Sequence, residues 1–167
     1  RRFAVDLSYI TERGGWYFAS WKGDEALSGG IATNIGIHFF DLLQWIFGSV
    51  REFKVHVRRS EVVAGTFALE RADVRWFLSV DADHLPEHVR GGGGKTFRSI
   101  TVDGEELNFT AYGAEDLHTA SYRRILIGEG FGLVDAAPSV QMTHDVRSAP
   151  LSRPGDTAHP RVREVLS

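Results

Sequence analysis

The chain has 167 residues, a formal net charge of −3 and no cysteine. This length suits one domain with a sizeable core, and 43% hydrophobic with 25% charged residues is ordinary for a globular protein. The negative charge, and aromatic residues that are not interleaved with Lys and Arg clusters, argue against a nucleic-acid partner. The absence of cysteine excludes a disulfide framework and thiolate chemistry, and agrees with the reducing cytoplasm where we expect this protein to act.

A membrane partner is not expected either. The longest apolar stretch is interrupted by His38, Asp41 and Gln44, and the first residues show no signal-peptide pattern. We therefore expect a soluble protein.

The first predicted element is a strand over residues 3–10, where Phe3, Val5, Leu7 and Tyr9 alternate with more polar positions. We expect it to be a central strand of an open sheet.

An irregular segment follows over residues 11–27. Its candidate ligand-binding residues are Arg13, Tyr17 and Lys22. An aromatic ring can stack on a ligand ring, Arg can pair with a carboxylate or diphosphate in a bidentate fork, and Lys can act as a point charge. Composition alone favours the simpler interpretation, which is a loop pinned by its aromatic side chains with solvated cations.

The segment Ser28 to Gly48 carries the most informative pattern. Its polar residues recur at steps of four, three and four and share one face of a predicted helix: Asn34, His38, Asp41 and Trp45. A neighbouring apolar stripe is expected to bury the helix: Ile35, Phe39, Leu42 and Ile46. Thr33 or Asn34 can cap the helix start, which places free N–H groups beside Gly29 and Gly30 and suits an anionic ligand.

Three strands are predicted next, over residues 53–57, 62–69 and 72–80. In the first strand apolar and polar residues alternate: Phe53, Val55 and Val57 are expected on the buried face, and Lys54, His56 and Arg58 on the solvent-exposed face. In the last, Phe77 lies on the face opposite Val74, Trp76, Leu78 and Val80. We therefore expect the second face of the sheet to be partly covered.

The loop over residues 81–96 is predicted to hold neither a metal nor a phosphate. His84 and His88 are separated by Pro86, and no His-Glu-x-x-His pattern forms. A P-loop ending at Lys95 and Thr96 would need glycine at position 89, where the chain has Val89. The glycine run at 91–94 is typical of a hairpin tip.

Two further strands, 97–102 and 107–110, flank Asp103-Gly104, which is a strong hairpin signal. Helices are predicted over 114–128 and 135–149, with Pro138 in the first turn of the second. We expect one domain over residues 1–149 and a tail over 150–167 that is loose until the short segment 162–166.

The pattern in the central segment resembles a known family, the C-terminal domain of the glucose-fructose oxidoreductase and inositol dehydrogenase superfamily. The matching positions are Gly29, Gly30, Gly36, His38, Asp41 and Trp45. Asn34 departs from the family, because most members carry Asp there, and an amide can bond a hydroxyl but cannot take its proton.

A longer resemblance, in order from about Asp6 to Ser148, is to the UDP-N-acetylglucosaminuronate 3-dehydrogenases of bacterial surface-polysaccharide synthesis. It is carried by the stretches DLSYITERGGWYFASWKGDEALSGG, VRWFLSVDADHLPE, SITVDGEELNFT and DLHTASYRRILIGEGFG. It implies a UDP-sugar substrate oxidised at C3 and an NAD cofactor. In some relatives 2-oxoglutarate reoxidises the NADH.

The resemblance also implies that the full-length enzyme has a second domain that this chain does not contain. Family members bind NAD in an N-terminal Rossmann domain with a Gly-x-Gly-x-x-Gly turn and a catalytic Lys in Glu-Lys-Pro, and this chain has neither motif. Gly128, Gly130 and Gly132 follow a helical pattern and predict a helix stop instead. We expect a fragment of a longer enzyme that is inactive alone.

The implied catalytic residue is His38, which works with the Lys of the absent domain. Asn34 would bond a hydroxyl or the acetamido group, and Asp41 would fix the His38 ring. Arg13, Tyr17 and Lys22 would bind the substrate. Without the resemblance, a helical His beside an Asp is more often a structural pair.

The predicted fold class is α+β: an open, mostly antiparallel sheet of about six or more strands with helices on one face. By resemblance, its open face pairs subunits of a homo-oligomer. Two alternatives stay open for the function. One is a domain of another sugar or inositol dehydrogenase of the superfamily, and the other, suggested by Asn34, is a non-catalytic binding or assembly domain.

Overall fold

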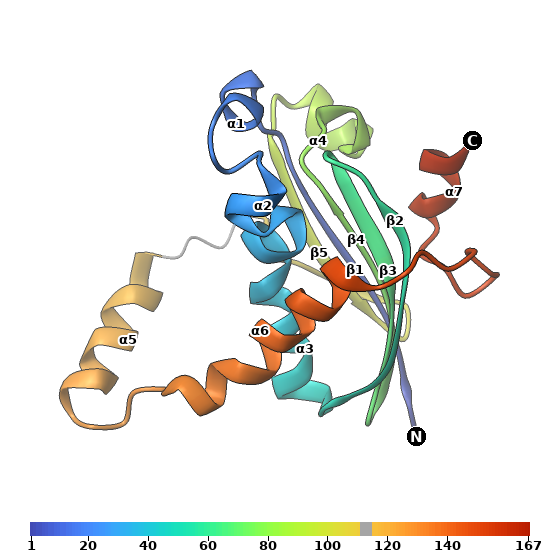
Figure 1. Ribbon diagram of the computed structural model, residues 1–167. Coiled ribbons are helices and arrows are strands. Elements are labelled where there is room, and N and C mark those ends of the chain that lie inside the picture. Colours follow the sequence, from blue (N-terminus) through green and yellow to red (C-terminus); the bar gives the residue numbers. More distant parts are fainter. Residues whose placement is uncertain (111–114) are drawn as a thin grey trace.

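The structure, a computed structural model, describes residues 1–110 and 115–167. Six strands form one sheet in the order β2-β3-β4-β1-β5-β6 (Figure 1). Their bounds are β1 Phe3–Thr11, β2 Val50–Arg58, β3 Val62–Leu69, β4 Ala72–Ser79, β5 Thr96–Val102 and β6 Glu105–Asn108. Only β1 and β4 pair in parallel, and the other neighbours in the sheet are antiparallel. The predicted open, mostly antiparallel sheet is therefore confirmed, with β1 near its centre.

The helices lie mainly on one face of this sheet, as expected (Figure 1). They are α1 Gly15–Ala19, α2 Glu25–Ser28, the π-helical turn η1 Ala32–Gly36, α3 Ile37–Phe47, the 3-10 turn η2 Ala82–His84, α4 Glu87–Gly91, α5 Glu115–Leu126, α6 Leu133–Ser148 and α7 Arg161–Leu166. The residue 114 at which we expected α5 to begin lies outside the described residues. None of the described helices has the length and apolarity needed to cross a membrane.

The predicted hairpin between β5 and β6 is confirmed, but β6 spans Glu105–Asn108 and so begins and ends two residues before the predicted strand. Asp103 has φ +50° and Gly104 has φ +94°, so both central residues lie in the left-handed region that a two-residue hairpin turn of this kind requires. β6 pairs with β5 from Val102 opposite Glu105 to Ser99 opposite Asn108.

The main core is formed where α3 lies on the sheet. The ring of Phe40 meets those of Phe67 and Trp76 edge-on, with centroids 4.9 and 5.2 Å apart. Two glycines allow this close approach. A Cβ on Gly36 would lie 2.6 Å from a methyl carbon of Leu78, and a Cβ on Gly65 would lie 2.6 Å from the Trp76 ring. Larger residues at either position would push the helix or the indole away.

The buried stripe of this helix differs from the predicted one. The side chains that face the sheet are Phe40, Leu43 and Phe47. Of the predicted stripe only Ile35 is fully buried; Phe39 and Leu42 are half-buried, and Ile46 is 40% exposed. The π-helical turn before α3 has more residues per turn than an α-helix, so it rotates the following residues relative to the α-helical pattern.

The alternation of buried and exposed side chains predicted for β2 is also wrong at the C-terminal end of the strand. The register with β3 shifts between Val55 and Val57, so His56 is the extra residue of a β-bulge. Val57 therefore packs on the second face of the sheet. Arg58 points to the helix layer, where Nη1 donates to the carbonyls of Val146 and Ala149 at 3.1 and 2.7 Å. A cation is favourable there because α6 ends at that point.

The second face of the sheet is partly covered, as Phe77 suggested. Phe77 is fully buried, and the chain that covers it is the C-terminal segment, which contributes Ala158 and Val162. This segment is attached earlier than we expected, because the Ser152 amide donates to the Val55 carbonyl at 2.8 Å. α7 lies across the sheet from α3 and α6 (Figure 1).

α6 begins at Leu133, two residues before the predicted start. Pro138 therefore lies inside the helix and not in its first turn. A proline there removes one backbone hydrogen bond and bends the helix. The half of α6 after Pro138 packs on the domain through Met142 and Val146.

His159 fixes the C-terminal segment to the sheet. Its ring stacks on Phe77 with centroids 5.6 Å apart, and it is 4% exposed. The Arg161 amide donates to Nδ1 at 3.3 Å, so the proton of the neutral ring is on Nε2, which donates to Ser8 Oγ at 3.2 Å. The pKa of His159 is lowered to about 4, mainly by burial. The charge of Asp6 acts to raise this pKa, and the charges of Arg161 and Arg75 act to lower it.

This burial makes stability depend on pH. In the unfolded chain His159 takes up a proton near pH 6.5, whereas in the folded chain it does so only near pH 4. The contribution of neutral His159 to the stability of the fold is therefore complete above pH 6.5 and is lost as the pH falls towards 4. We expect the free energy of unfolding to drop by about 2 kcal/mol between pH 7 and pH 5 from this residue. Urea unfolding of the unchanged protein and of the His159→Phe variant, each at pH 7 and pH 5, measures this drop in the free energy of unfolding. Parallel losses in the two proteins would contradict the assignment.

Candidate functional site

The candidate site is built around the turn between α2 and α3. Asp24 caps α2 by accepting from the amides of Ala26 and Leu27 at 2.8 and 3.3 Å. The chain then reverses at Gly29 and Gly30, whose φ angles of +81° and +70° explain why glycine occupies both positions. η1 and α3 follow directly and carry Asn34, His38 and Asp41.

Asn34 joins three separate pieces of the chain. Its Nδ2 lies 3.3 Å from Tyr17 Oη, 3.2 Å from the Lys22 carbonyl and 3.1 Å from Ser28 Oγ. The Lys22 carbonyl can only accept, so the amide nitrogen faces it and the amide oxygen faces away. The structure thus brings together three predicted site residues: Asn34, Tyr17 and the main chain of Lys22.

The Tyr17 ring is not free to stack on a ligand. It is 3% exposed and packs edge-on against Trp16 and Phe18. Only its hydroxyl reaches the site, through Asn34. The exposed rings of this region are instead Trp16, Phe18 and Trp21, which are 55%, 44% and 59% exposed.

The two cations of the segment are held differently. Lys22 is exposed, and its ammonium lies 5.9 Å from the ring centroids of both Trp16 and Trp21. Arg13 is fixed through its main chain, whose amide donates to the Val80 carbonyl at 3.0 Å. Within residues 1–110 and 115–167 the Arg13 guanidinium has no hydrogen-bond or ion-pair partner, so it is free to meet an anion.

His38 and Asp41 are both exposed on the outward side of α3. Across the described part of the chain neither side chain has a hydrogen bond or ion pair, and none joins the two. The predicted positioning of the His38 ring by Asp41 therefore stays a prediction. An exposed imidazole one helical turn after Asn34 is suitably placed to exchange a proton with a ligand that Asn34 holds.

A pocket of about 230 Å³ adjoins Asn34's partners and was not found from the sequence. It is lined by Tyr17, the Gly29–Gly30 turn and three arginines: Arg58, Arg59 and Arg147. Arg147 donates to the Glu25 carbonyl at 3.1 Å, and its buried Nε has no partner among the described residues. The arginines come from separate segments, and the bulge in β2 brings Arg58 to this side, so no local pattern indicates the pocket. The lining also includes one acidic side chain, Glu25, so the pocket has an excess of positive charge, which suits an anion.

The glycines that follow α5 do not form a dinucleotide-binding turn. Gly128, with φ +78°, ends α5, and Gly132 caps α6, which confirms the predicted helix stop and differs from the strand-turn-helix of a dinucleotide site. No three His or acidic side chains in the described ranges gather closely enough to hold a metal ion.

The fold and the α2–α3 turn place this chain in a family. Residues 2–79 match the model of the C-terminal alpha/beta domain of the Gfo/Idh/MocA oxidoreductases. The chain belongs to this family as its C-terminal domain, which confirms the resemblance drawn from the glycine pair, Gly36 and His38.

Solved structures show which members of this family the chain is similar to. The chain is 53% identical to the WlbA (WbpB) dehydrogenase from Thermus thermophilus, over 96% of this chain and 52% of that one. The TM-score is 0.92 to its complex with NAD and alpha-ketoglutarate and 0.91 to its complex with NAD and UDP-GlcNAcA. A second similar structure is the WlbA dehydrogenase from Bordetella pertussis, which was solved with NADH and UDP-GlcNAcA. It is 16% identical to this chain, and the match covers 87% of this chain and 53% of that one. Its TM-score of 0.64 shows a shared fold. The chain spans about half the length of these relatives.

Replacing Asn34 should loosen the α1–α2 segment. Asn34→Ala removes the side-chain donor of the exposed Lys22 carbonyl and one of the two donors of the Ser28 hydroxyl, which keeps the Gly30 amide. We expect this loss to cost about 0.5–1.5 kcal/mol of stability. Hydrogen exchange should accelerate over residues 14–28. Asn34→Asp should act in the same direction because a carboxylate cannot donate to a carbonyl.

The matched control is Asp41→Ala, an exposed residue one turn further along, which should change stability by less than about 0.5 kcal/mol. Unchanged exchange over residues 14–28 in Asn34→Ala would show that Asn34 does not hold this segment.

Proposed function

We propose that this domain supplies the substrate half of the active site of an NAD-dependent dehydrogenase that oxidises C3 of UDP-N-acetylglucosaminuronate. The observation that carries the proposal is the 53% identity over 96% of this chain to a dehydrogenase solved with NAD and UDP-GlcNAcA. The position of Asn34 and His38 one helical turn apart supports it chemically.

The reaction breaks the C3–H and O–H bonds of a secondary alcohol and forms a C=O bond. NAD, when bound, accepts the hydride from C3. The hydroxyl proton must leave at the same carbon, and His38 takes it, alone or shared with a Lys of the half beyond this chain. An imidazole is suited to this role because it can both accept and release a proton.

Asn34 would orient the sugar. Its amide nitrogen is used by the protein, so the amide oxygen remains to accept a hydrogen bond from a sugar hydroxyl or from the acetamido N–H. It cannot serve as a base, which leaves proton transfer to His38. Asp41 would orient the His38 ring once a ligand is bound.

The charges of the substrate would be met from α1 and its flanks. The uronate and the diphosphate are both anionic, and the Arg13 guanidinium and the Lys22 ammonium are the predicted partners. The Tyr17 hydroxyl, held at Asn34, completes the predicted binding residues. NAD itself would be bound mainly by the half beyond this chain, as the family resemblance implies.

Two further roles belong to this proposal. NADH would be reoxidised by 2-oxoglutarate, which is supported by the alpha-ketoglutarate complex of the Thermus thermophilus relative. Subunits would pair through the part of the second sheet face that α7 leaves open, where Arg75 and Asp6 form an ion pair.

The test is made on the protein extended by the half that precedes this domain in its relatives. With UDP-N-acetylglucosaminuronate we expect NADH absorbance to rise, or reduced 2-oxoglutarate to accumulate when that acceptor is added. His38→Ala should lower kcat by at least 10²-fold, because it removes the proton acceptor. The isolated 167-residue chain should form no NADH.

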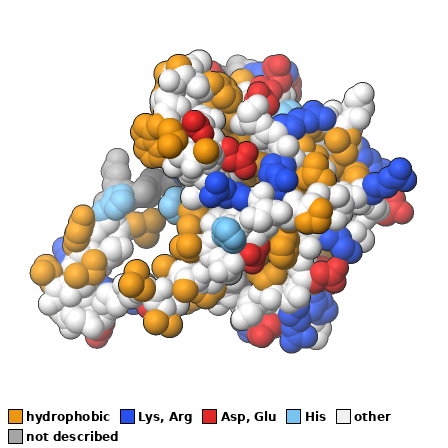
Figure 2. Space-filling view, viewed as in Figure 1, with side chains coloured by type: hydrophobic (Ala, Val, Ile, Leu, Met, Phe, Trp, Pro, Cys, Tyr) orange, Lys and Arg blue, Asp and Glu red, His pale blue; other side chains and the backbone are white. Residues whose placement is uncertain are grey.

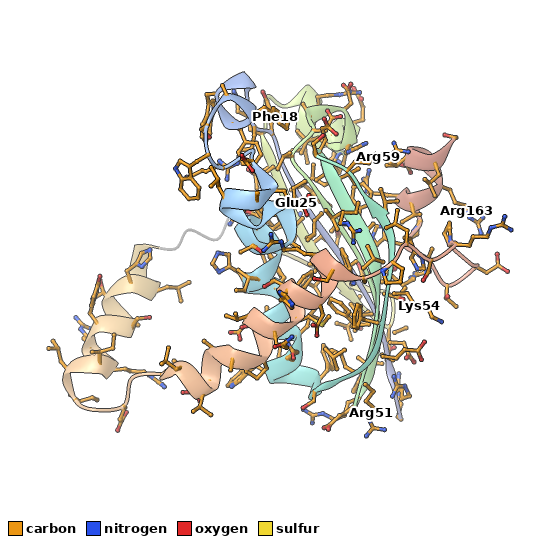
Figure 3. The ribbon with its side chains drawn as sticks, in the orientation of Figure 1. Phe18, Glu25, Arg51, Lys54, Arg59 and Arg163 are labelled. Atoms are coloured by element: carbon orange, nitrogen blue, oxygen red, sulfur yellow. The ribbon has the colours of Figure 1, made fainter. Side chains whose placement is uncertain are left out.

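Arg51→Ala is the control, because Arg51 is exposed at the end of the domain away from α1 and should leave kcat unchanged (Figure 3). Turnover of a different sugar or of an inositol would transfer the assignment to another member of the superfamily. Absence of turnover with both acceptors would favour the non-catalytic alternative that Asn34 leaves open.

A further inference from the structure

The arginine-lined pocket beside the Gly29–Gly30 turn is a second place where this chain can bind a ligand. The pocket lies between α2, the C-terminal end of α6 and the turn that joins β2 to β3. Figure 2 shows basic side chains beside an acidic one where α2, the end of α6 and the sheet come together, and Figure 3 labels Glu25 there. The pocket is therefore built by segments that are distant in sequence.

This pocket is separate from the candidate substrate site. Of the predicted site residues, Tyr17 alone lines it, and the Tyr17 hydroxyl lies 3.3 Å from Asn34 Nδ2. The chain after the glycine turn contributes Ile31 and Ala32 to the pocket, whereas neither Asn34 nor His38 lines it. A ligand in the pocket and a sugar nucleotide at α3 would therefore contact different residues, with Tyr17 between them.

Positive charge without an acidic partner lines the pocket. In the part of the chain that the structure describes, the guanidiniums of Arg58, Arg59 and Arg147 donate only to backbone carbonyls, and no carboxylate lies within ion-pair distance of them. Arg75 and Arg161, which are half-buried like Arg58 and Arg147, each pair with an acidic side chain. The pocket thus holds charge that the described residues do not neutralise.

Two of these guanidiniums are held in fixed positions. Arg58 Nη1 donates to the carbonyls of Val146 and Ala149, and Arg147 Nη2 donates to the Glu25 carbonyl. These bonds use one nitrogen of each guanidinium, and the buried Nε of Arg147 has no partner among the described residues. A buried donor without a partner is costly, and a phosphate or a carboxylate can accept two N–H groups of one guanidinium. The arrangement suits an oxyanion.

The charge and the size of the pocket limit the kind of anion. Three arginines against Glu25 leave the lining with an excess of positive charge, although Arg59 directs Nη1 to the Val165 carbonyl of α7. The pocket volume is about 230 Å³. At about 30 Å³ per water molecule, this is room for roughly seven or eight waters. A phosphate ion or a short dicarboxylate fits this space, whereas a sugar nucleotide, which has many more atoms, does not.

We propose that this pocket binds a small oxyanion, inorganic phosphate or a short dicarboxylate, at a site separate from the substrate site. The ion accepts hydrogen bonds from Arg58 and Arg147 and so ties β2, α6 and α2 together. Because α2 belongs to the segment that Asn34 holds from the other side, the ion stabilises the position of that segment. A ligand that binds only the folded chain also raises its stability. The proposal does not depend on the identity of the substrate.

Titration of the 167-residue chain with inorganic phosphate or with succinate, at constant ionic strength, tests the site. The anion that binds should raise the Tm and shift the Nε–H resonance of Arg147 in ¹⁵N NMR spectra, which also distinguishes phosphate from a dicarboxylate. Arg147→Gln should weaken binding by about 10-fold or more, because it removes a charge-assisted donor. Arg51→Gln, at an exposed arginine of β2 outside the pocket, is the matched control and should bind like the parent.

Two further variants leave the arginine contacts in place, so their results do not depend on a loss of folding. Ser60→Asp adds a negative charge at an exposed position of the lining and should weaken binding by about 5-fold. Glu25→Gln removes the negative charge of the lining and should tighten binding by a similar factor. Binding of neither anion at millimolar concentration, or equal affinities of the parent, Ser60→Asp and Glu25→Gln, would overturn the proposal.

The protein extended by the preceding half separates this proposal from the proposed function. The bound anion should stay in place when UDP-N-acetylglucosaminuronate is added, as the Arg147 resonance would show. Displacement by the sugar nucleotide would make the pocket part of the substrate site and would contradict a separate site. A failure of the extended protein to oxidise the sugar nucleotide would refute the proposed function and would leave the anion titration unchanged.

Discussion

The close approach of α3 to the sheet is the constraint on which the rest of this domain depends. Gly36 and Gly65 leave no side chain between the helix and the strands beneath it, and Phe40 fills the space against Phe67 and Trp76. This contact fixes the rotation of α3 about its own axis. Because the buried side is fixed, the opposite side, with His38, must face outward.

Asn34 links this rigid base to the segment that carries the binding residues. The α1–α2 region is short and irregular and has little core of its own apart from Tyr17. The hydrogen bonds of the Asn34 amide join this segment to α3, together with the buried Tyr17 ring and the bond from Arg147 to the Glu25 carbonyl. The same amide leaves its oxygen for a ligand, so in this account folding and substrate orientation use different atoms of one side chain.

Much of the fold could be predicted from local patterns. Alternation located β1, β3 and β4, and Asp103-Gly104 located the hairpin, because both signals depend on a few neighbouring residues. The π-helical turn before α3 and the bulge at His56 could not be predicted, since each inserts an irregularity that only the packing of distant elements selects. The pocket with Arg58 and Arg147 was missed for the same reason. At the candidate site, spacing correctly placed His38 and Asp41 on one side of a helix, but only the structure shows that Tyr17 is buried and reaches the site by its hydroxyl.

The most direct test of the central claim, that the outward side of α3 binds the sugar nucleotide, is an NMR titration. The ¹⁵N-labelled chain would be titrated with UDP-N-acetylglucosaminuronate up to millimolar concentration. We expect the side-chain NH₂ of Asn34 and the backbone amides of residues 34–41 to shift, while those near Arg51 stay unchanged. Shifts confined to the pocket of Arg58 and Arg59, or no shifts at all, would contradict the account.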